Sequence, residues 1–284
     1  MYILLISLSF AILFPFIAKF SISLMTTQDL NDPMVRFIPH QFTLDNYIFV
    51  YENTSWLLAL VQTVVLSLIC AGLQVFVSCF IGYGLANFKF RGNKIIFGII
   101  LFTMILPPVA TRTATYIHFT FFDLYGLIPP LRMVDSMWPM IYLSATGLAL
   151  KNGLYIFVFR QYFARVPHEL SEAAEVDGAG VFRTYFRIIL PLASSMMLTV
   201  FLLAFAWQWN DSFYSPLFFP KFKVLSNTIF VVSQLGLSGI YAGSQLSSVM
   251  INTALIMLIV PLLLLYLFAQ RYFIQGIERS GLVG

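Results

Sequence analysis

Six stretches of this chain are apolar over about the length that a lipid bilayer demands, and this pattern restricts the possible folds most strongly. A helix that crosses the hydrocarbon core needs about 20 consecutive, mostly apolar residues. The stretches cover about residues 1–24, 56–86, 95–117, 138–159, 192–219 and 248–268. Runs this long indicate helices, because backbone groups in lipid must be bonded within their own segment. We therefore expect an all-α membrane protein in which residues 1–284 form a single domain, a bundle of about six transmembrane helices.

The composition excludes an ordinary soluble domain. The chain is 60% hydrophobic and 10% charged, whereas soluble domains carry about 25% charged residues. Cys70 and Cys79 lie in one apolar stretch, about 13 Å apart along a helix and on roughly opposite faces, so they cannot pair. No histidine has a second ligand at metal spacing, and no basic tail suggests nucleic acid. We predict no catalytic residue, no metal site and no nucleic-acid partner.

Lysine and arginine indicate which loops face the cytoplasm. The loop at residues 88–94 and the loops on the same side hold more of these residues than the opposite loops do, and such an excess marks the cytoplasmic side. Both termini then lie in the cytoplasm. The first stretch lacks a charged leading region and a clear cleavage site, so we interpret it as an anchor helix rather than a signal peptide.

Residues 160–191 form the one long polar insertion on that side. Glu169 and Glu172 favour a helix start, where the helix dipole is positive. Ala173 and Ala174 are small helix formers, and Gly178 can adopt the left-handed conformation that ends a helix. The pattern predicts a short helix, a turn and a second helix. By physics alone this is either a docking surface for another backbone or an ordinary helical hairpin in a loop.

The spacing within this insertion resembles a known motif. Glu172-Ala173-Ala174 is followed after three residues by Gly178 and after nine more by Ile-Ile-Leu-Pro at 188–191. This pattern is similar to the EAA motif of permease subunits of binding-protein-dependent ABC importers. The resemblance implies that residues 160–191 form a cytoplasmic coupling segment, between the fourth and fifth spans, whose helix fits a cleft on an ATPase subunit. It assigns the contact to Glu172, Ala173, Ala174, Asp177, Gly178, Ala179, Leu190 and Pro191.

Other features are similar to the carbohydrate, maltose-type branch of that family. Trp209-Asn210-Asp211 followed by Pro216-Leu217 matches its fifth span, and Gly126-Leu127 follows a proline-broken third span, as in that branch. Two departures are the short lead before the first span and a tail, residues 275–284, without the usual lysine. Whether this tail contacts the ATPase stays open.

The resemblance implies a subunit of the bacterial cytoplasmic (inner) membrane that imports a sugar or oligosaccharide by alternating access. The expected partners are a second permease subunit, an ATPase dimer, an extracytoplasmic solute-binding protein and the lipid bilayer. The chain contains no Gly-x-x-x-x-Gly-Lys-Ser/Thr pattern for binding ATP phosphates. We therefore expect no cofactor in this chain, with ATP and magnesium bound by the partner ATPase.

Polar residues within the apolar stretches are candidates for the solute path, because such residues usually face an interior or a pathway. They are Lys151 and Asn152 in the fourth stretch, and Trp209, Asn210 and Asp211 in a cluster that begins with Trp207 and Gln208. An aromatic ring with amide and carboxylate groups suits a sugar. The alternatives are a lysine that extends to the interface, and an interfacial aromatic belt with a helix cap.

Two other functions compete with this interpretation. An ion-coupled secondary transporter would show paired membrane carboxylates or internal repeats, and a membrane-embedded transferase would show clustered acid, base or metal groups. Neither feature is clear in the sequence. The solute also stays open among a disaccharide, a longer oligosaccharide, a uronate and a polyol phosphate.

Overall fold

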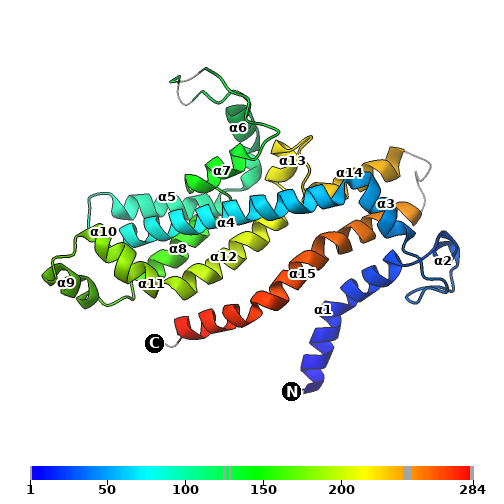
Figure 1. Cartoon of the computed structure of the whole chain (residues 1–284), viewed down its shortest axis with the longest axis horizontal. Helices are drawn as coiled ribbons and strands as arrows, with labels where there is room; N and C mark the ends of the chain where they lie inside the picture. Colours follow the sequence, from blue (N-terminus) through cyan, green and yellow to red (C-terminus); the bar gives the residue numbers. More distant parts are fainter. Residues whose placement is uncertain (1, 124–125, 128, 239–244, 282–284) are drawn as a thin grey trace. The chain divides into compact units, whose positions relative to one another are not determined.

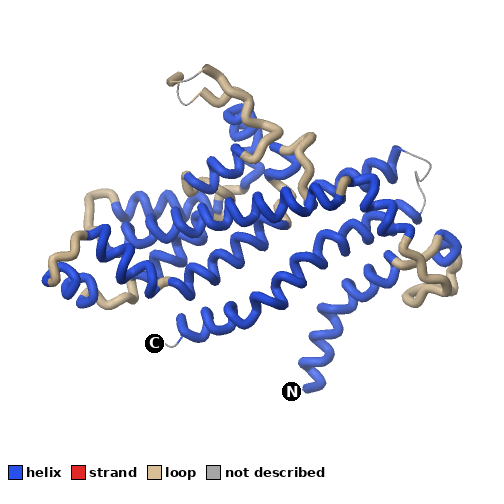
Figure 2. Tube along the Cα trace, in the orientation of Figure 1, coloured by secondary structure: helices blue, strands red, loops and turns tan. Residues whose placement is uncertain are grey.

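The computed structural model describes residues 2–123, 126–127, 129–238 and 245–281. Within these residues the regular structure is helical, and β-structure is limited to the isolated bridges Met25–Phe42 and Phe122–Leu131. The all-α prediction is confirmed (Figure 2). The chain divides into two compact units, Met1–Val64 with Lys221–Leu267, and Val65–Pro220 with Phe268–Gly284. The single domain over residues 1–284 stays a prediction.

In the first unit, polar contacts join the end of the first helix to two other helices. Its helices are α1 (Tyr2–Ser23), α2 (Thr27–Asn31), α3 (Asp45–Thr54), the start of α4 (Trp56–Asn87), α14 (Leu225–Ser238) and most of α15 (Gln245–Gly281). The Lys19 ammonium donates a hydrogen bond to Asn252 Oδ1 at 2.9 Å. The Asn46 amide donates to the carbonyl oxygens of Ser23 and Met25 at 2.9 and 3.0 Å. These bonds fix α1 to α15 and to α3.

The second unit contains a helix bundle and carries the predicted site residues (Figure 1). Besides most of α4, its helices are α5 (Asn93–Ile105), α6 (Pro108–Thr120), α7 (Trp138–Ala145), α8 (Asn152–Phe163), α9 (Glu169–Val176), α10 (Val181–Thr184), a π-helical turn (Tyr185–Ile189), α11 (Leu190–Leu192), α12 (Ser194–Trp209) and α13 (Tyr214–Phe218).

Two glycines let α8 approach its neighbours closely. A Cβ added to Gly82 of α4 would lie 2.6 Å from Phe159 Cβ and 2.9 Å from the Arg160 backbone nitrogen. A Cβ on Gly153 of α8 would lie 2.8 Å from Thr103 Oγ1 of α5. Small residues at helix crossings are the usual means of packing helices tightly in membranes. These crossings place α8 between α4 and α5.

Three of the six predicted spans are confirmed as helices long and apolar enough to cross a membrane: Tyr2–Ser23, Trp56–Asn87 and Ser248–Phe268. The third stretch is divided at Pro107, where α5 and α6 meet at 100°. Part of the fifth stretch forms α12, which is bent by 73° from the segment before it. By length and composition the described residues supply three spans, or up to five if each bent pair is one. The count of six stays a prediction.

The expected continuous helices over residues 138–159 and 192–219 are wrong. Helix α7 ends at Ala145, Gly147 adopts φ +75°, and α8 begins only at Asn152. The N–H of Leu148 donates to Leu143 O at 2.9 Å, and that of Gly147 to Ser144 O at 3.4 Å. These two bonds are those of a Schellman motif, which closes a helix with a left-handed residue, usually glycine. Similarly, α12 ends at Trp209, and a separate helix starts at Tyr214.

Candidate functional site

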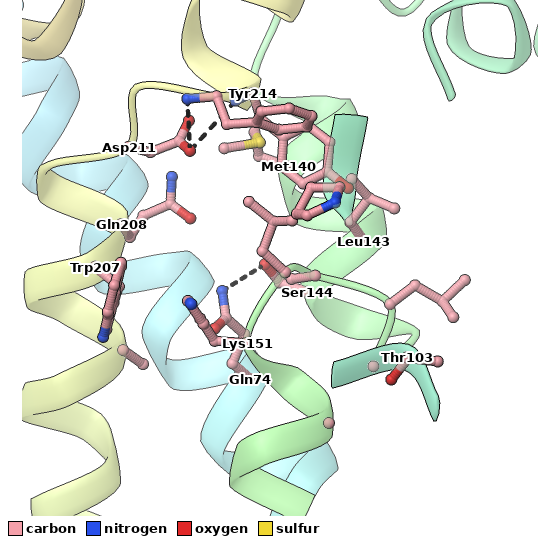
Figure 3. A pocket seen from close by; sticks show the side chains of 18 of the residues that line it. Gln74, Thr103, Met140, Leu143, Ser144, Lys151, Trp207, Gln208, Asp211 and Tyr214 are labelled. Carbon is pink, nitrogen blue, oxygen red and sulfur yellow. Dashed lines mark hydrogen bonds between the residues drawn. The ribbon is translucent and has the colours of Figure 1, made fainter. Parts of the chain in front are cut away.

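A cavity of about 420 Å³ lies within the second unit (Figure 3). Its lining residues come from α4, α5, α6, α7, α8, α12 and α13 and from the α5–α6, α7–α8 and α12–α13 connections. Its polar lining residues are Gln74, Thr103, Thr111, Ser144, Lys151, Gln208, Asn210, Asp211 and Ser212, and its aromatic ones are Trp207, Phe213 and Tyr214. Gln74 Nε2 donates to Ser144 Oγ at 3.2 Å and joins α4 to α7 on one wall. The cavity thus combines aromatic faces with hydroxyl and amide groups.

Lys151 lies at the break between α7 and α8, as the residue preceding the first turn of α8. Its ammonium lies 4.1 Å from the centre of the Trp207 ring, a cation–π contact between the α7–α8 connection and α12. Figure 3 shows the two side chains next to each other on one side of the cavity. The break in the fourth stretch therefore brings the lysine to the cavity.

Asp211 also lines the cavity, but its carboxylate is occupied by the backbone. Oδ1 accepts hydrogen bonds from the N–H groups of Phe213 and Tyr214, both at 3.3 Å. Oδ2 accepts from the Ser215 N–H at 2.5 Å and from its hydroxyl at 2.8 Å. The carboxylate therefore bonds the free N–H groups at the start of α13, which explains why α12 and α13 are separate helices.

The other predicted path residues divide between the cavity and the helix packing. Asn210 lines the cavity, and its amide donates to Ala206 O at 2.9 Å. Asn152 is fully buried and donates to Ser78 Oγ of α4 at 2.9 Å. Trp209 is 2% exposed, with its ring 5.7 Å from that of Phe205. The cavity thus receives Trp207 from the aromatic cluster, while Trp209 packs inside the unit.

Sequence reasoning overlooked the α4 and α5–α6 walls of the cavity. Gln74 is a buried amide in the middle of the long apolar helix α4. A single polar residue among apolar ones could have predicted that it faces an interior or a pathway. Ser144, Thr103 and Thr111 gave no such signal, because serine and threonine in apolar helices commonly bond to their own backbone. Thr103 and Thr111 do so, at 2.7 and 3.1 Å from Ile100 O and Pro108 O.

The predicted coupling segment contains the expected helix, turn and helix. Helix α9 is followed by Gly178 at φ +76°. The N–H of Ala179 donates to Ala174 O at 2.8 Å, and that of Gly178 to Glu175 O at 3.0 Å, which again are the two bonds of a Schellman motif. The prediction that Gly178 takes the left-handed conformation is confirmed.

Within α9 only Ala174 is buried and Ser171 is half-buried, and the other residues of this helix are exposed. Ala174 is 4% exposed, whereas Val176 is 88% exposed. The segment also packs on α4 through two aromatic residues, since the Tyr185 ring lies 4.9 Å from that of Tyr83, which makes an edge contact with Phe163 at 5.5 Å. Of the predicted contact residues, Glu172, Ala173, Asp177, Gly178 and Pro191 are exposed, and Ala179 and Leu190 are half-buried. Figure 1 shows α9 and α10 at one end of the bundle of the second unit.

The chain matches the model of a protein family over residues 74–279, described as the binding-protein-dependent transport system inner membrane component. This chain belongs to that family. It is accordingly a permease subunit of a transport system and a multi-pass membrane protein, and the matched region includes both the cavity and the predicted coupling segment.

Individual relatives agree with this membership. The permease is 28% identical over 253 residues to the arabinooligosaccharides transport system permease protein AraQ of Bacillus subtilis, covering 87% of this chain and 81% of that protein. It is 27% identical over 276 residues to the sn-glycerol-3-phosphate transport system permease protein UgpE of Yersinia pestis, covering 95% and 92%.

A solved structure shares the fold of the permease. It is a chain from the crystal structure of a bacterial ABC transporter involved in the import of the acidic polysaccharide alginate. The TM-score is 0.73 at 20% sequence identity, over 96% of this chain and 94% of that chain. The architecture is therefore that of an ABC importer permease.

Proposed function

We propose that this permease is one of the two membrane-spanning subunits of an ATP-driven importer for a sugar or oligosaccharide. The observation that carries the proposal is the exposed α9 helix, closed by the Gly178 turn, in a chain of this family. The names of the relatives AraQ and UgpE support a sugar-like solute. ATP and magnesium would be bound by a partner ATPase, and this chain would supply no catalytic residue.

Helix α9 would transmit the motion of the ATPase to the bundle. A docking element must present a surface that the partner can reach, and Glu172, Ala173 and Asp177 are exposed. It must also be fixed to the part that it moves, and Ala174 is buried against the unit. Transport by alternating access then requires that the bundle adopt two arrangements, which ATP binding in the partner would bias.

The cavity of the second unit would form part of the solute path, with Lys151, Asn210 and Asp211 in its wall. The aromatic face of Trp207 suits the apolar face of a sugar ring, and amides such as Gln74 and Gln208 suit its hydroxyls. Asn152 and Trp209 would support this wall from behind. A solute-binding protein would deliver the solute from outside, and both termini would face the cytoplasm; of the tail at 275–284, residues 282–284 lie outside the described part.

The test is purification of this permease from detergent-solubilised membranes, followed by measurement of ATP hydrolysis with and without candidate sugar-binding proteins. We expect an ATPase and a second permease subunit to co-purify, and hydrolysis to rise with a loaded binding protein. A lone chain that transports solute down an ion gradient in vesicles would overturn the proposal in favour of a secondary transporter.

A further inference from the structure

Two charged side chains, Lys151 and Asp211, line the cavity of the second unit. They differ in the number of polar partners that stabilise their charge. The Asp211 carboxylate accepts four hydrogen bonds, two on each oxygen. A carboxylate offers about four lone-pair positions, so this group has no acceptor position left for a solute. The N–H groups at the start of α13 also stabilise its negative charge.

The Lys151 ammonium has no such compensation. Among the described residues it forms no ion pair and no hydrogen bond, and its one recorded contact is the Trp207 ring at 4.1 Å. An ammonium in an intramembrane cavity is costly unless a counter-charge or several acceptors reach it. Helix α8 begins directly after Lys151, so the positive end of its dipole has the same sign as the ammonium.

Gln208 adds an unused donor to the same wall. Its Nε2 atom is buried and has no hydrogen-bond partner among the described residues. Figure 3 shows the Gln208 side chain in the cavity between Asp211 and the pair formed by Lys151 and Trp207. A buried amide donor without a partner is unfavourable, because it has lost its hydrogen bonds to water. The wall therefore offers an ammonium, an amide N–H and an aromatic face, while its carboxylate is occupied.

We propose that the solute of this permease carries an anionic group, which binds Lys151 and Gln208 during passage through the cavity. The chemical class is a sugar bearing a carboxylate, as in uronic acids, or a phosphate ester. The Trp207 ring would pack against the sugar ring beside that group. This inference depends on the proposed function as a sugar importer and specifies the charge of its solute, which membership of the family does not determine.

The test uses the complete importer, purified with its partner subunits and solute-binding protein and reconstituted into vesicles with ATP. The probes are trigalacturonate with its methyl ester, and glucose 6-phosphate with glucose, so that each anion has a neutral counterpart and the two anionic groups are separated. ATP-dependent uptake and stimulation of ATP hydrolysis are measured for each. We expect one anionic probe to be transported and its neutral counterpart to be transported at least about tenfold less, as for the loss of one charge-assisted hydrogen bond.

Three variants separate the charge of Lys151 from its shape. Lys151→Met keeps the length and apolar stem of the side chain, and should lower uptake of the anionic probe about tenfold or more. Lys151→Arg keeps the charge and should retain most of the uptake. Lys89→Met removes an exposed lysine outside the cavity and should leave uptake unchanged. Co-purification of the partners with each variant shows that the importer has assembled.

The outcomes distinguish this inference from the proposed function. A wild-type importer that hydrolyses ATP in response to a neutral sugar as well as to its anionic counterpart would overturn the charge inference alone. So would uptake of an anionic probe that Lys151→Met leaves unchanged. A wild-type chain that recruits no ATPase would overturn the proposed function instead.

Discussion

The turn at Gly178 and the break at Gly147 have the same backbone conformation, but they lie in different surroundings. Both glycines have φ near +75° and both end a helix with the same pair of hydrogen bonds. Around Gly178 an added Cβ would meet nothing within 4 Å, whereas at Gly147 it would lie 3.4 Å from Val77 Cγ1. The first turn ends the exposed helix α9, and the second ends α7 beside a cavity. The same local stop is therefore open to a proposed docking partner at Gly178, whereas at Gly147 it shapes a cavity wall.

The largest expected effect is that of Gly178→Asp. The change adds a Cβ at a left-handed position, which costs about 1–2 kcal/mol, and places a charge on the surface proposed to contact the ATPase, where an unpaired charge is costly. We expect the variant to reach the membrane and to lose at least about nine-tenths of ATP-dependent uptake. Uptake in vesicles is the measurement, with Gly178→Asn as the uncharged control of equal size. Normal uptake by Gly178→Asp would contradict the proposal that α9 and its turn contact the ATPase.

Gly147→Ala should act on stability more than on coupling. Alanine at φ +75° costs about 1–2 kcal/mol, and the 3.4 Å contact with Val77 is tolerable. We expect a lower midpoint of thermal unfolding in detergent, with hydrolysis of ATP by the folded complex still stimulated by a loaded binding protein. Gly72→Ala in the straight helix α4, where a Cβ meets nothing, is the matched control. Equal midpoints for both variants would show that the break does not depend on glycine.

A smaller effect is expected from the hydrogen bond that holds the end of α7. Gln74→Leu and Ser144→Ala each remove one partner of the 3.2 Å bond, and interhelical bonds of this kind contribute about 0.6 kcal/mol on average. We expect the double variant to lose less free energy of unfolding than the sum of the two single losses, by about that amount. Unfolding by denaturant of the two single variants and the double variant measures it. Strict additivity would mean that the α4–α7 bond does not stabilise this wall.

The smallest effect should come from Gly180→Ala, two residues after the coupling turn. Gly180 has φ −72°, and its added Cβ would meet nothing within 4 Å. Alanine fits such a position without strain, so stability should change by less than about 0.5 kcal/mol. Thermal unfolding and uptake both measure this. A marked loss of uptake with unchanged stability would extend the proposed contact surface for the ATPase to Gly180.

The difference between the two glycines also explains what sequence reasoning could predict. Gly178 follows Glu172, Glu175 and Asp177 within the polar insertion, so its role in ending a helix was visible. Gly147 lies among Leu148, Ala149 and Leu150, which are as apolar as a continuing helix. Hydropathy therefore predicted one span over residues 138–159, and tertiary packing produced two helices. The long, unbroken stretches that became α1 and α4 were predicted nearly to the residue.

The sequence predicted the chemical groups that line the cavity better than it predicted which residues supply them. Lys151 stood out as an intramembrane charge, although whether it lined a cavity or extended to the interface was open. Trp207 and Trp209 lie two positions apart, about 200° around a helix, and only one can face the cavity. Helix α12 is apolar on all sides, so no periodicity could choose between them. Only the packing of α12 against α8 decides that Trp207 meets Lys151.

The bond between Lys19 and Asn252 has a consequence for the order in which the molecule is made. These two residues are separated by 233 positions in the chain. Because chains are synthesised at about 5–20 residues per second, Lys19 enters the membrane roughly 10 to 50 seconds before its partner exists. During that interval its ammonium must be satisfied by water, lipid headgroups or the insertion machinery. The first helix of the permease thus reaches its final position only when the last helix has been synthesised.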